Sequence, residues 1–198
     1  MNTAAINARE HLDEYRDDLT LIEARQVYFD KNRLGDGGYT SRWAKITVFG
    51  LSYWMPNPKA RRAALPYHDL NHVLTGYPPT TAGESILAGF EVGSGIGPYW
   101  LGWLISSQAM ALGILFVPRA VFRAWVRGRR SGSTYKLALD ADMLARPLGE
   151  VRQGLGIPEP SSELRATPAD VLRFVAHVVA TLVLHALPVA ALIALLSR

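Results

Sequence analysis

The chain of 198 residues contains no cysteine, and this absence excludes several classes of functional site. Disulfides, thiolate-bound metals, iron–sulfur clusters and thiol nucleophiles all require that residue. Any metal must therefore be held by nitrogen and oxygen atoms. Histidine is also scarce, which excludes sites that need many imidazoles. The five histidines are His11, His68, His72, His177 and His185.

The chain also lacks a strong excess of either charge, since 21 Lys and Arg stand against 17 Asp and Glu, a formal net charge of +4. So small an excess does not indicate a nucleic-acid-binding protein. Apolar residues make up 49% of the chain, which is too many for a disordered protein. The acidic residues among the first 18 positions argue against a secretory signal peptide or a mitochondrial presequence.

Two long stretches lack charged residues altogether, and the second spans residues 174–197. It is long enough to cross about 30 Å of hydrocarbon as a helix. Thr167, Pro168 and Asp170 supply a helix-start signal before it. We therefore expect a C-terminal hydrophobic membrane helix at 174–196, either spanning the bilayer or lying in its interface, after a linker at 161–173. A buried core helix is the alternative.

His177 and His185 would lie about 12 Å apart along that helix, which is too far to share one metal. We interpret them as polar-contact or snorkelling residues and not as ligands.

The first uncharged stretch, residues 92–118, is rich in small and polar residues that favour close packing between helices. We expect a semi-buried helix there that meets a membrane surface or lines an apolar groove. Five arginines follow it and would attract an anionic membrane at about 1 kcal/mol per charge. A solvated basic face is the alternative. These arginines are Arg119, Arg123, Arg127, Arg129 and Arg130.

The spacing of apolar residues predicts an all-α fold. It indicates one or two helices within residues 6–34 and helical structure within 137–155, whereas 43–54 suits either a helix or a strand. A further helix is expected to start near Pro66 and to end at Gly76. No run of alternating strands is evident.

The residues that point most clearly to chemistry lie between positions 66 and 84. His68 and His72 are four residues apart, so on a helix both imidazoles project from one face, a spacing typical of divalent-metal ligands. Asp69 could be a further ligand or an acceptor that orients an imidazole. A tight reversal after Gly76 would let a helix carrying Glu84 fold back and supply an oxygen ligand.

Two observations weaken the metal interpretation when spacing alone is considered. The pattern His-x-x-x-His is frequent by chance. Thr81 and Glu84 also have the spacing of a capping box, in which the glutamate bonds the helix start and binds no metal. Asp69 stands where a zinc protease of the His-Glu-x-x-His type carries its glutamate base, which argues against that class.

The complete string, His-Asp-x-x-His followed by eleven residues and Glu84, resembles the Coq4 family of ubiquinone-biosynthesis proteins. The neighbouring segments HDLNHVLTGYP, GESILAGFE, WVRGRR and PLGEVRQGLGIP are similar to the family as well. The resemblance covers roughly residues 37–158. The region before His68 is short for the family, and a hydrophobic helix at 174–196 is not one of its features.

This resemblance implies an all-helical domain over residues 1–160 whose metal ligands and catalytic residues are His68, Asp69, His72 and Glu84, with Zn²⁺ as the expected ion. It implies a membrane-associated protein of prenylquinone synthesis, on the cytoplasmic face of a bacterial inner membrane. The substrate would be a polyprenylated benzoate-derived precursor that undergoes decarboxylation and hydroxylation at C1.

We expect Arg127, Arg129 and Arg130 to pair with the substrate carboxylate, with Trp125 as a further substrate-binding residue. The prenyl tail would lie along the helix from Ile96 to Val117.

Two other function classes remain open. One is a non-catalytic prenyl-lipid-binding scaffold that organises quinone-biosynthesis enzymes on the membrane. The other is a metal hydrolase acting on a lipid ester or phosphate. Other biosynthetic enzymes, membrane lipid and a second copy of the chain are the expected partners.

Overall fold

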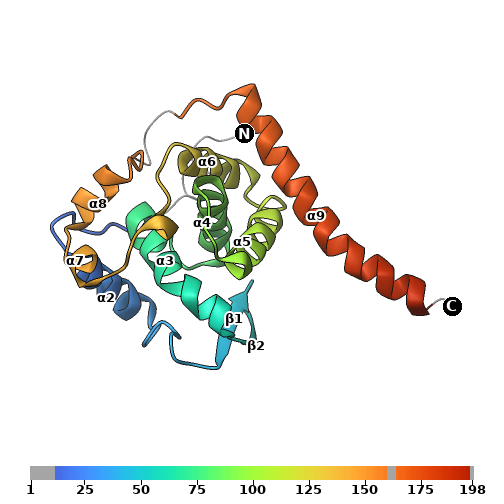
Figure 1. Ribbon diagram of the computed structural model, residues 1–198, viewed down its shortest axis with the longest axis horizontal. Coiled ribbons are helices and arrows are strands. Elements are labelled where there is room, and N and C mark those ends of the chain that lie inside the picture. Colours follow the sequence, from blue (N-terminus) through green and yellow to red (C-terminus); the bar gives the residue numbers. More distant parts are fainter. Residues whose placement is uncertain (1–11, 160–163, 197–198) are drawn as a thin grey trace.

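The structure is a computed structural model that describes residues 12–159 and 164–196 (Figure 1). Within those residues the chain forms eight α-helices, one short 3-10 turn and a two-stranded antiparallel sheet. The elements are α2 (Leu21–Asn32), β1 (Trp43–Val48), β2 (Leu51–Pro56), α3 (Lys59–Thr75), α4 (Thr81–Ser94), α5 (Trp100–Gly113), α6 (Pro118–Arg129), η1 (Thr134–Lys136), α7 (Ala141–Leu144), α8 (Leu148–Gly154) and α9 (Pro168–Leu196). The protein is mostly helical, as predicted, but the hairpin departs from an all-α fold.

Helix α3 begins earlier than its sequence indicates. Pro66 lies inside the helix, which starts at Lys59, so the predicted start near Pro66 is wrong. A proline removes one main-chain hydrogen bond. Burial of Ala64 and Leu65 nevertheless keeps the preceding turns helical. The helix ends at Gly76 as predicted, in the left-handed conformation (φ 82°), with its N–H donated to the carbonyl of His72.

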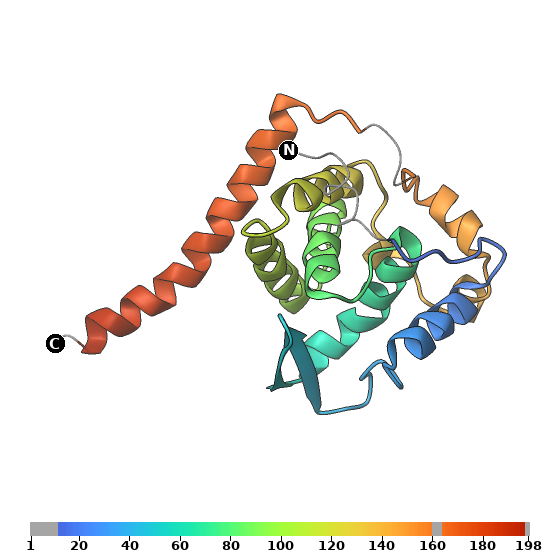
Figure 2. The same ribbon diagram turned by 180° about the vertical axis from the view of Figure 1, so that it is seen from behind.

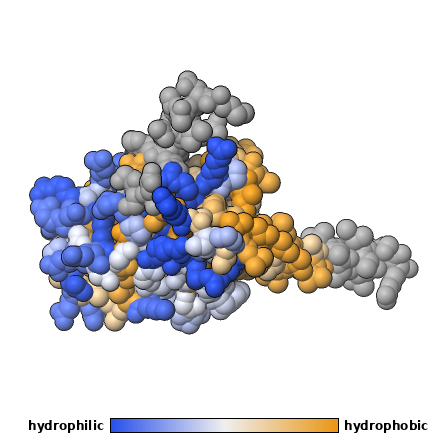
Figure 3. Space-filling model, turned by 90° about the horizontal axis from the view of Figure 1, so that it is seen from above, coloured by the Kyte–Doolittle hydropathy of each residue, from blue (hydrophilic) through white to orange (hydrophobic). Residues whose placement is uncertain are grey.

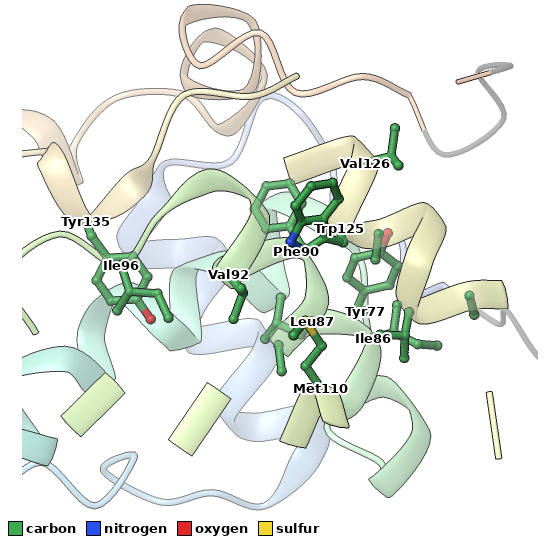
Figure 4. Close-up of a cluster of buried hydrophobic side chains, with 14 of the residues drawn as sticks. Tyr77, Ile86, Leu87, Phe90, Val92, Ile96, Met110, Trp125, Val126 and Tyr135 are labelled. Carbon is green, nitrogen blue, oxygen red and sulfur yellow. The ribbon is translucent and has the colours of Figure 1, made fainter. Parts of the chain in front are cut away.

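Helix α4 lies at the centre of the larger hydrophobic core and packs mainly against α5 and α6 (Figure 4). Two glycines allow its backbone to approach that of α6. A Cβ atom at Gly93 would lie 2.2 Å from the carbonyl oxygen of Trp125, and one at Gly128 would lie 2.1 Å from that of Phe90. The Trp125 side chain is fully buried among these residues. It therefore belongs to the core, and its burial does not support the predicted substrate-binding role.

Helix α3 separates the larger core from a second one formed with α2 and α8. Its Ala64 belongs to the first core, whereas Leu70 and Val73 belong to the second. Because both sides of α3 are covered, side chains on the intervening face, His72 among them, are held inside the protein.

The uncharged stretch 92–118 does not form the single helix expected from Ile96 to Val117. Gly95 (φ 93°) and Gly97 (φ 56°) adopt conformations that interrupt helices, and α5 starts only at Trp100. Helix α5 is half-buried, as predicted, with Ser106 and Met110 facing inward.

Helix α9 starts with the predicted signal, since the Thr167 hydroxyl accepts a hydrogen bond from the N–H of Asp170 (3.2 Å). It packs against α5 and α6 and then projects from the body, where apolar surface gathers (Figures 1 and 3). Among the residues whose side chains are described, which in α9 are 168–184, 186 and 187, no helix is long and apolar enough to cross a membrane, so they do not support the predicted spanning anchor. The rest of the stretch predicted as an anchor, 174–196, lies outside those residues.

His177, on α9, does not join the residues that were predicted to bind metal. His177 donates from Nδ1 to the carbonyl of Arg173 in its own helix (3.0 Å), which agrees with its predicted role as a polar-contact residue. The His185 side chain and His11 lie outside the described residues.

The β1–β2 hairpin lies beside the first turns of α3, at an edge of the molecule (Figure 2). Its strands pair antiparallel, from Trp43 opposite Pro56 to Val48 opposite Leu51. The turn is fixed to the helical body by Phe49. Its N–H donates to the Thr81 hydroxyl (3.0 Å), and its ring meets that of Phe116 at 5.0 Å.

Candidate metal centre

Three predicted ligands converge between α3 and α4. The Nε2 atoms of His68 and His72 lie 3.3 Å apart. Glu84 approaches each imidazole with a different carboxylate oxygen, 3.3 Å from His68 Nε2 and 3.4 Å from His72 Nε2. A tetrahedral zinc with bonds of about 2.0–2.1 Å separates its nitrogen and oxygen ligands by about 3.3–3.4 Å. The donor set and its spacing therefore fit a divalent ion such as Zn²⁺.

The position of Glu84 depends on how α4 begins. Thr80, not Thr81, is the N-cap residue, and its hydroxyl accepts from the N–H of Gly83 (3.1 Å). The Thr81 hydroxyl instead accepts from Phe49 in the hairpin. Thr81 and Glu84 therefore do not form the alternative capping box, and the carboxylate of Glu84 faces the imidazoles.

Both imidazoles are held so that Nε2 faces Glu84. His72 places Nδ1 2.7 Å from the carbonyl oxygen of Tyr77, and its ring stacks on that of Tyr28 at 5.0 Å. A carbonyl only accepts hydrogen bonds, so Nδ1 of His72 carries a proton and Nε2 is the atom left to bind a metal. His68 places Nδ1 3.1 Å from a carboxylate oxygen of Glu91. This is the orientation that metal-binding histidines require.

The three groups form a tightly coupled charged cluster. Burial opposes protonation of His68, but the charges of Glu91 and Glu84 and their hydrogen bonds outweigh it and raise its pKa well above the ordinary value. Burial also opposes ionisation of Glu84, yet its attraction to His72 and its hydrogen bonds to both imidazoles keep its pKa below the usual value. A divalent cation would replace the imidazolium proton as the partner of Glu84.

The structure does not bring the fourth predicted ligand to this group. Asp69 accepts a hydrogen bond from the hydroxyl of Tyr39 (2.6 Å) and does not join His68, His72 and Glu84 in the ligand cluster found among the described residues. Burial raises the pKa of Asp69. The hydrogen bond to Tyr39, thirty residues earlier in the chain, holds this carboxylate outside the cluster.

A buried carboxylate next to the cluster was missed by sequence reasoning. Glu91 is fully buried and accepts hydrogen bonds from Asn71 and Tyr135. Its sequence signal is the seven-residue spacing from Glu84, which places both carboxylates on one face of α4.

Two of the three arginines predicted to bind the substrate carboxylate already have structural partners. Arg127 is buried and donates to the carbonyls of Pro158 (2.7 Å) and Thr75 (3.0 Å). Arg130 forms an ion pair with Asp170 at the start of α9 (2.7 Å). The remaining one, Arg129, lies over the Trp125 ring, 5.9 Å from its centroid. The contacts of Arg127 and Arg130 connect α6 to the rest of the fold, whereas that of Arg129 stays within α6. None of them directs these cations toward Glu84.

The cluster is partly exposed to solvent. His72 is fully buried, whereas the side chains of His68 and Glu84 are 25% and 39% exposed. Three protein ligands with one accessible side are typical of a catalytic metal site, because a structural zinc is usually enclosed by four ligands. No protein-family model, no curated protein and no solved structure matches this chain.

Proposed function

We propose that this chain is a metal-dependent enzyme that removes the C1 carboxylate of a polyprenylated benzoate-derived precursor in the synthesis of ubiquinone or a related prenylquinone. The observation that carries the proposal is the convergence of His68, His72 and Glu84 within 4.8 Å of one another. The substrate class comes from the resemblance of the His-Asp-x-x-His and Glu84 pattern to the Coq4 family.

A divalent metal held by these residues, with zinc the expected ion, would supply Lewis acidity toward an oxygen of the substrate. The protein supplies the geometry. Tyr77 and Glu91 hold the two imidazoles by their Nδ1 atoms. The partly exposed edges of His68 and Glu84 provide the approach for the substrate.

The surface of the hairpin supports a membrane-associated role. Its apolar side chains are exposed to solvent, including Trp54 (66%) and Leu51 (77%). The chain from residue 37 to residue 68 contains five basic residues and no acidic one. Aromatic side chains among basic residues suit the interface of an anionic bilayer, where a polyprenyl substrate resides. The hairpin contacts Thr81, three residues before Glu84, so this surface lies close to the cluster.

A non-catalytic prenyl-lipid-binding scaffold is the second candidate. The observation that favours it is the row of exposed apolar residues on α9, among them Leu172, Leu182 and Leu187. Such a surface can bind lipid or another protein without any chemistry at the cluster.

Matched glutamine variants separate the two candidates. Glu84→Gln keeps the size of the side chain but removes its charge from the cluster, whereas Glu150→Gln makes the same change on the exposed surface of α8. Both proteins are purified and their zinc content is measured, and both are tested for restoring quinone synthesis in cells that lack it.

We expect Glu84→Gln to lose most of its zinc and its ability to restore synthesis while remaining folded, and Glu150→Gln to behave as the wild type. Full quinone synthesis by a folded, metal-free Glu84→Gln protein would eliminate the enzymatic proposal and favour the scaffold.

A further inference from the structure

We infer that Glu91 is a positioning residue for the metal centre, holding the His68 ring so that its Nε2 atom faces Glu84 and His72. The inference rests on the proposed metal function, because it concerns a carboxylate that acts through one of the ligands. Glu91 itself lies on the opposite side of the His68 ring from the cluster, 3.1 Å from Nδ1.

The carboxylate of Glu91 is completely enclosed and fully hydrogen-bonded. Its exposed fraction is 0%. Oε1 accepts from Asn71 Nδ2 (2.9 Å) and from the Tyr135 hydroxyl (2.8 Å), in addition to its contact with His68. Oε2 accepts from the Ser106 hydroxyl (2.7 Å).

These donors come from three separate elements, α3, α5 and η1, and fix the carboxylate from several directions. The amide of Asn71 is itself oriented, because the Thr134 hydroxyl donates to its oxygen Oδ1 (2.7 Å). The NH₂ group of Asn71 must therefore face Glu91. Because Asn71, Tyr135 and Ser106 donate to the carboxylate from fixed positions, Glu91 has little freedom to turn away from the imidazole of His68.

His68 is the one basic residue whose contact with Glu91 is seen among the described residues. The neutral donors Asn71, Tyr135 and Ser106 could be satisfied by an uncharged acceptor, so they give no reason to bury a full charge. An ionised carboxylate beside Nδ1 only accepts hydrogen bonds. It therefore keeps the proton on Nδ1, leaves Nε2 to bind a metal and makes the imidazole a more basic ligand.

The test compares zinc affinity in the full chain and in the variant Glu91→Gln. Affinity is measured by competition with a chromophoric chelator, and Co²⁺ is then substituted so that its visible absorption bands report the ligand geometry. We expect the zinc dissociation constant of Glu91→Gln to rise about 10–100-fold and its Co²⁺ bands to shift. Glu150→Gln is the matched control, because it makes the same change on the exposed surface of α8, away from His68.

The thermal midpoint of each metal-free protein is recorded separately, because a purely structural role would lower that midpoint without changing the zinc affinity of the folded protein. That result, or unchanged Co²⁺ bands in Glu91→Gln, would overturn the inference. If Glu91→Gln does not fold, Glu91→Asp retains the charge but withdraws it from Nδ1, and unchanged zinc affinity there overturns the inference equally. A wild-type chain that binds no zinc would instead refute the proposed metal function.

Discussion

Replacing Gly93 with alanine tests the packing that positions α4, the helix that carries Glu84 and Glu91. The new Cβ would lie 2.2 Å from the carbonyl oxygen of Trp125 and 3.2 Å from the backbone nitrogen of Arg129. Both are backbone atoms, so no side-chain rotation relieves the contact and α4 must move away from α6. Overpacking of a core in this way costs up to about 3 kcal/mol.

The gain in helix propensity from glycine to alanine returns about 1 kcal/mol, which leaves a net loss of about 2 kcal/mol. For a domain of this size each kcal/mol lowers the thermal midpoint by about 2–4 °C, so Gly93→Ala should melt about 4–8 °C below the wild type. Circular dichroism at 222 nm during heating measures the shift.

Gly154→Ala is the control for this prediction, because a Cβ at Gly154 in α8 meets no atom within 4 Å. Its midpoint should stay the same or rise slightly. A Gly93→Ala protein as stable as the wild type would refute the close approach of α4 to α6 and, with it, the placement of Glu84 that depends on α4.

Two further predictions concern pH and the membrane. The pKa of His68 is raised, so a metal must displace a proton from Nε2. At pH values below that pKa, zinc affinity should therefore rise about tenfold for each unit of increasing pH. A zinc affinity that stays constant between pH 5.5 and 7 would contradict this. Trp54→Gln should bind vesicles containing phosphatidylglycerol about 10- to 150-fold more weakly, since burying a large apolar side chain contributes roughly 1.5–3 kcal/mol. Ile22→Gln, an equally polar change at an exposed position of α2, should bind as the wild type, and equal binding by all three proteins in a sedimentation assay would argue against the hairpin as the contact.

Local signals in the sequence predicted the parts of the site that lie within one helix. The four-residue spacing of His68 and His72 places both on one face of α3 by helix geometry alone. Gly76 marks the end of that helix because glycine adopts the left-handed conformation without a steric penalty. The start of α9 at Pro168 follows from the hydrogen-bonding capacity of Thr167 and Asp170 in the same way.

The roles of the remaining charged residues depend on packing partners far along the chain. Asp69 and Glu91 are both acids near His68, and nothing local distinguishes their roles. Asp69 turns to the hydroxyl of Tyr39, thirty residues earlier, whereas Glu91 meets His68 because α4 folds back beside α3. Arg127 has the charge expected of a residue that binds a substrate carboxylate, but its guanidinium donates to the carbonyl of Thr75, 52 residues away.

The sequence by itself therefore determined which helix face carries the two imidazoles, where that helix ends and that any metal must be bound by nitrogen and oxygen, because these follow from backbone geometry and residue chemistry over a few positions. The tertiary structure alone decided that Glu84 joins them, that Asp69 does not and that Trp125 is core. The placement of Glu84 and the burial of Trp125 depend on the close contact of α4 with α6, whereas Asp69 is held outside the cluster by Tyr39, thirty residues earlier.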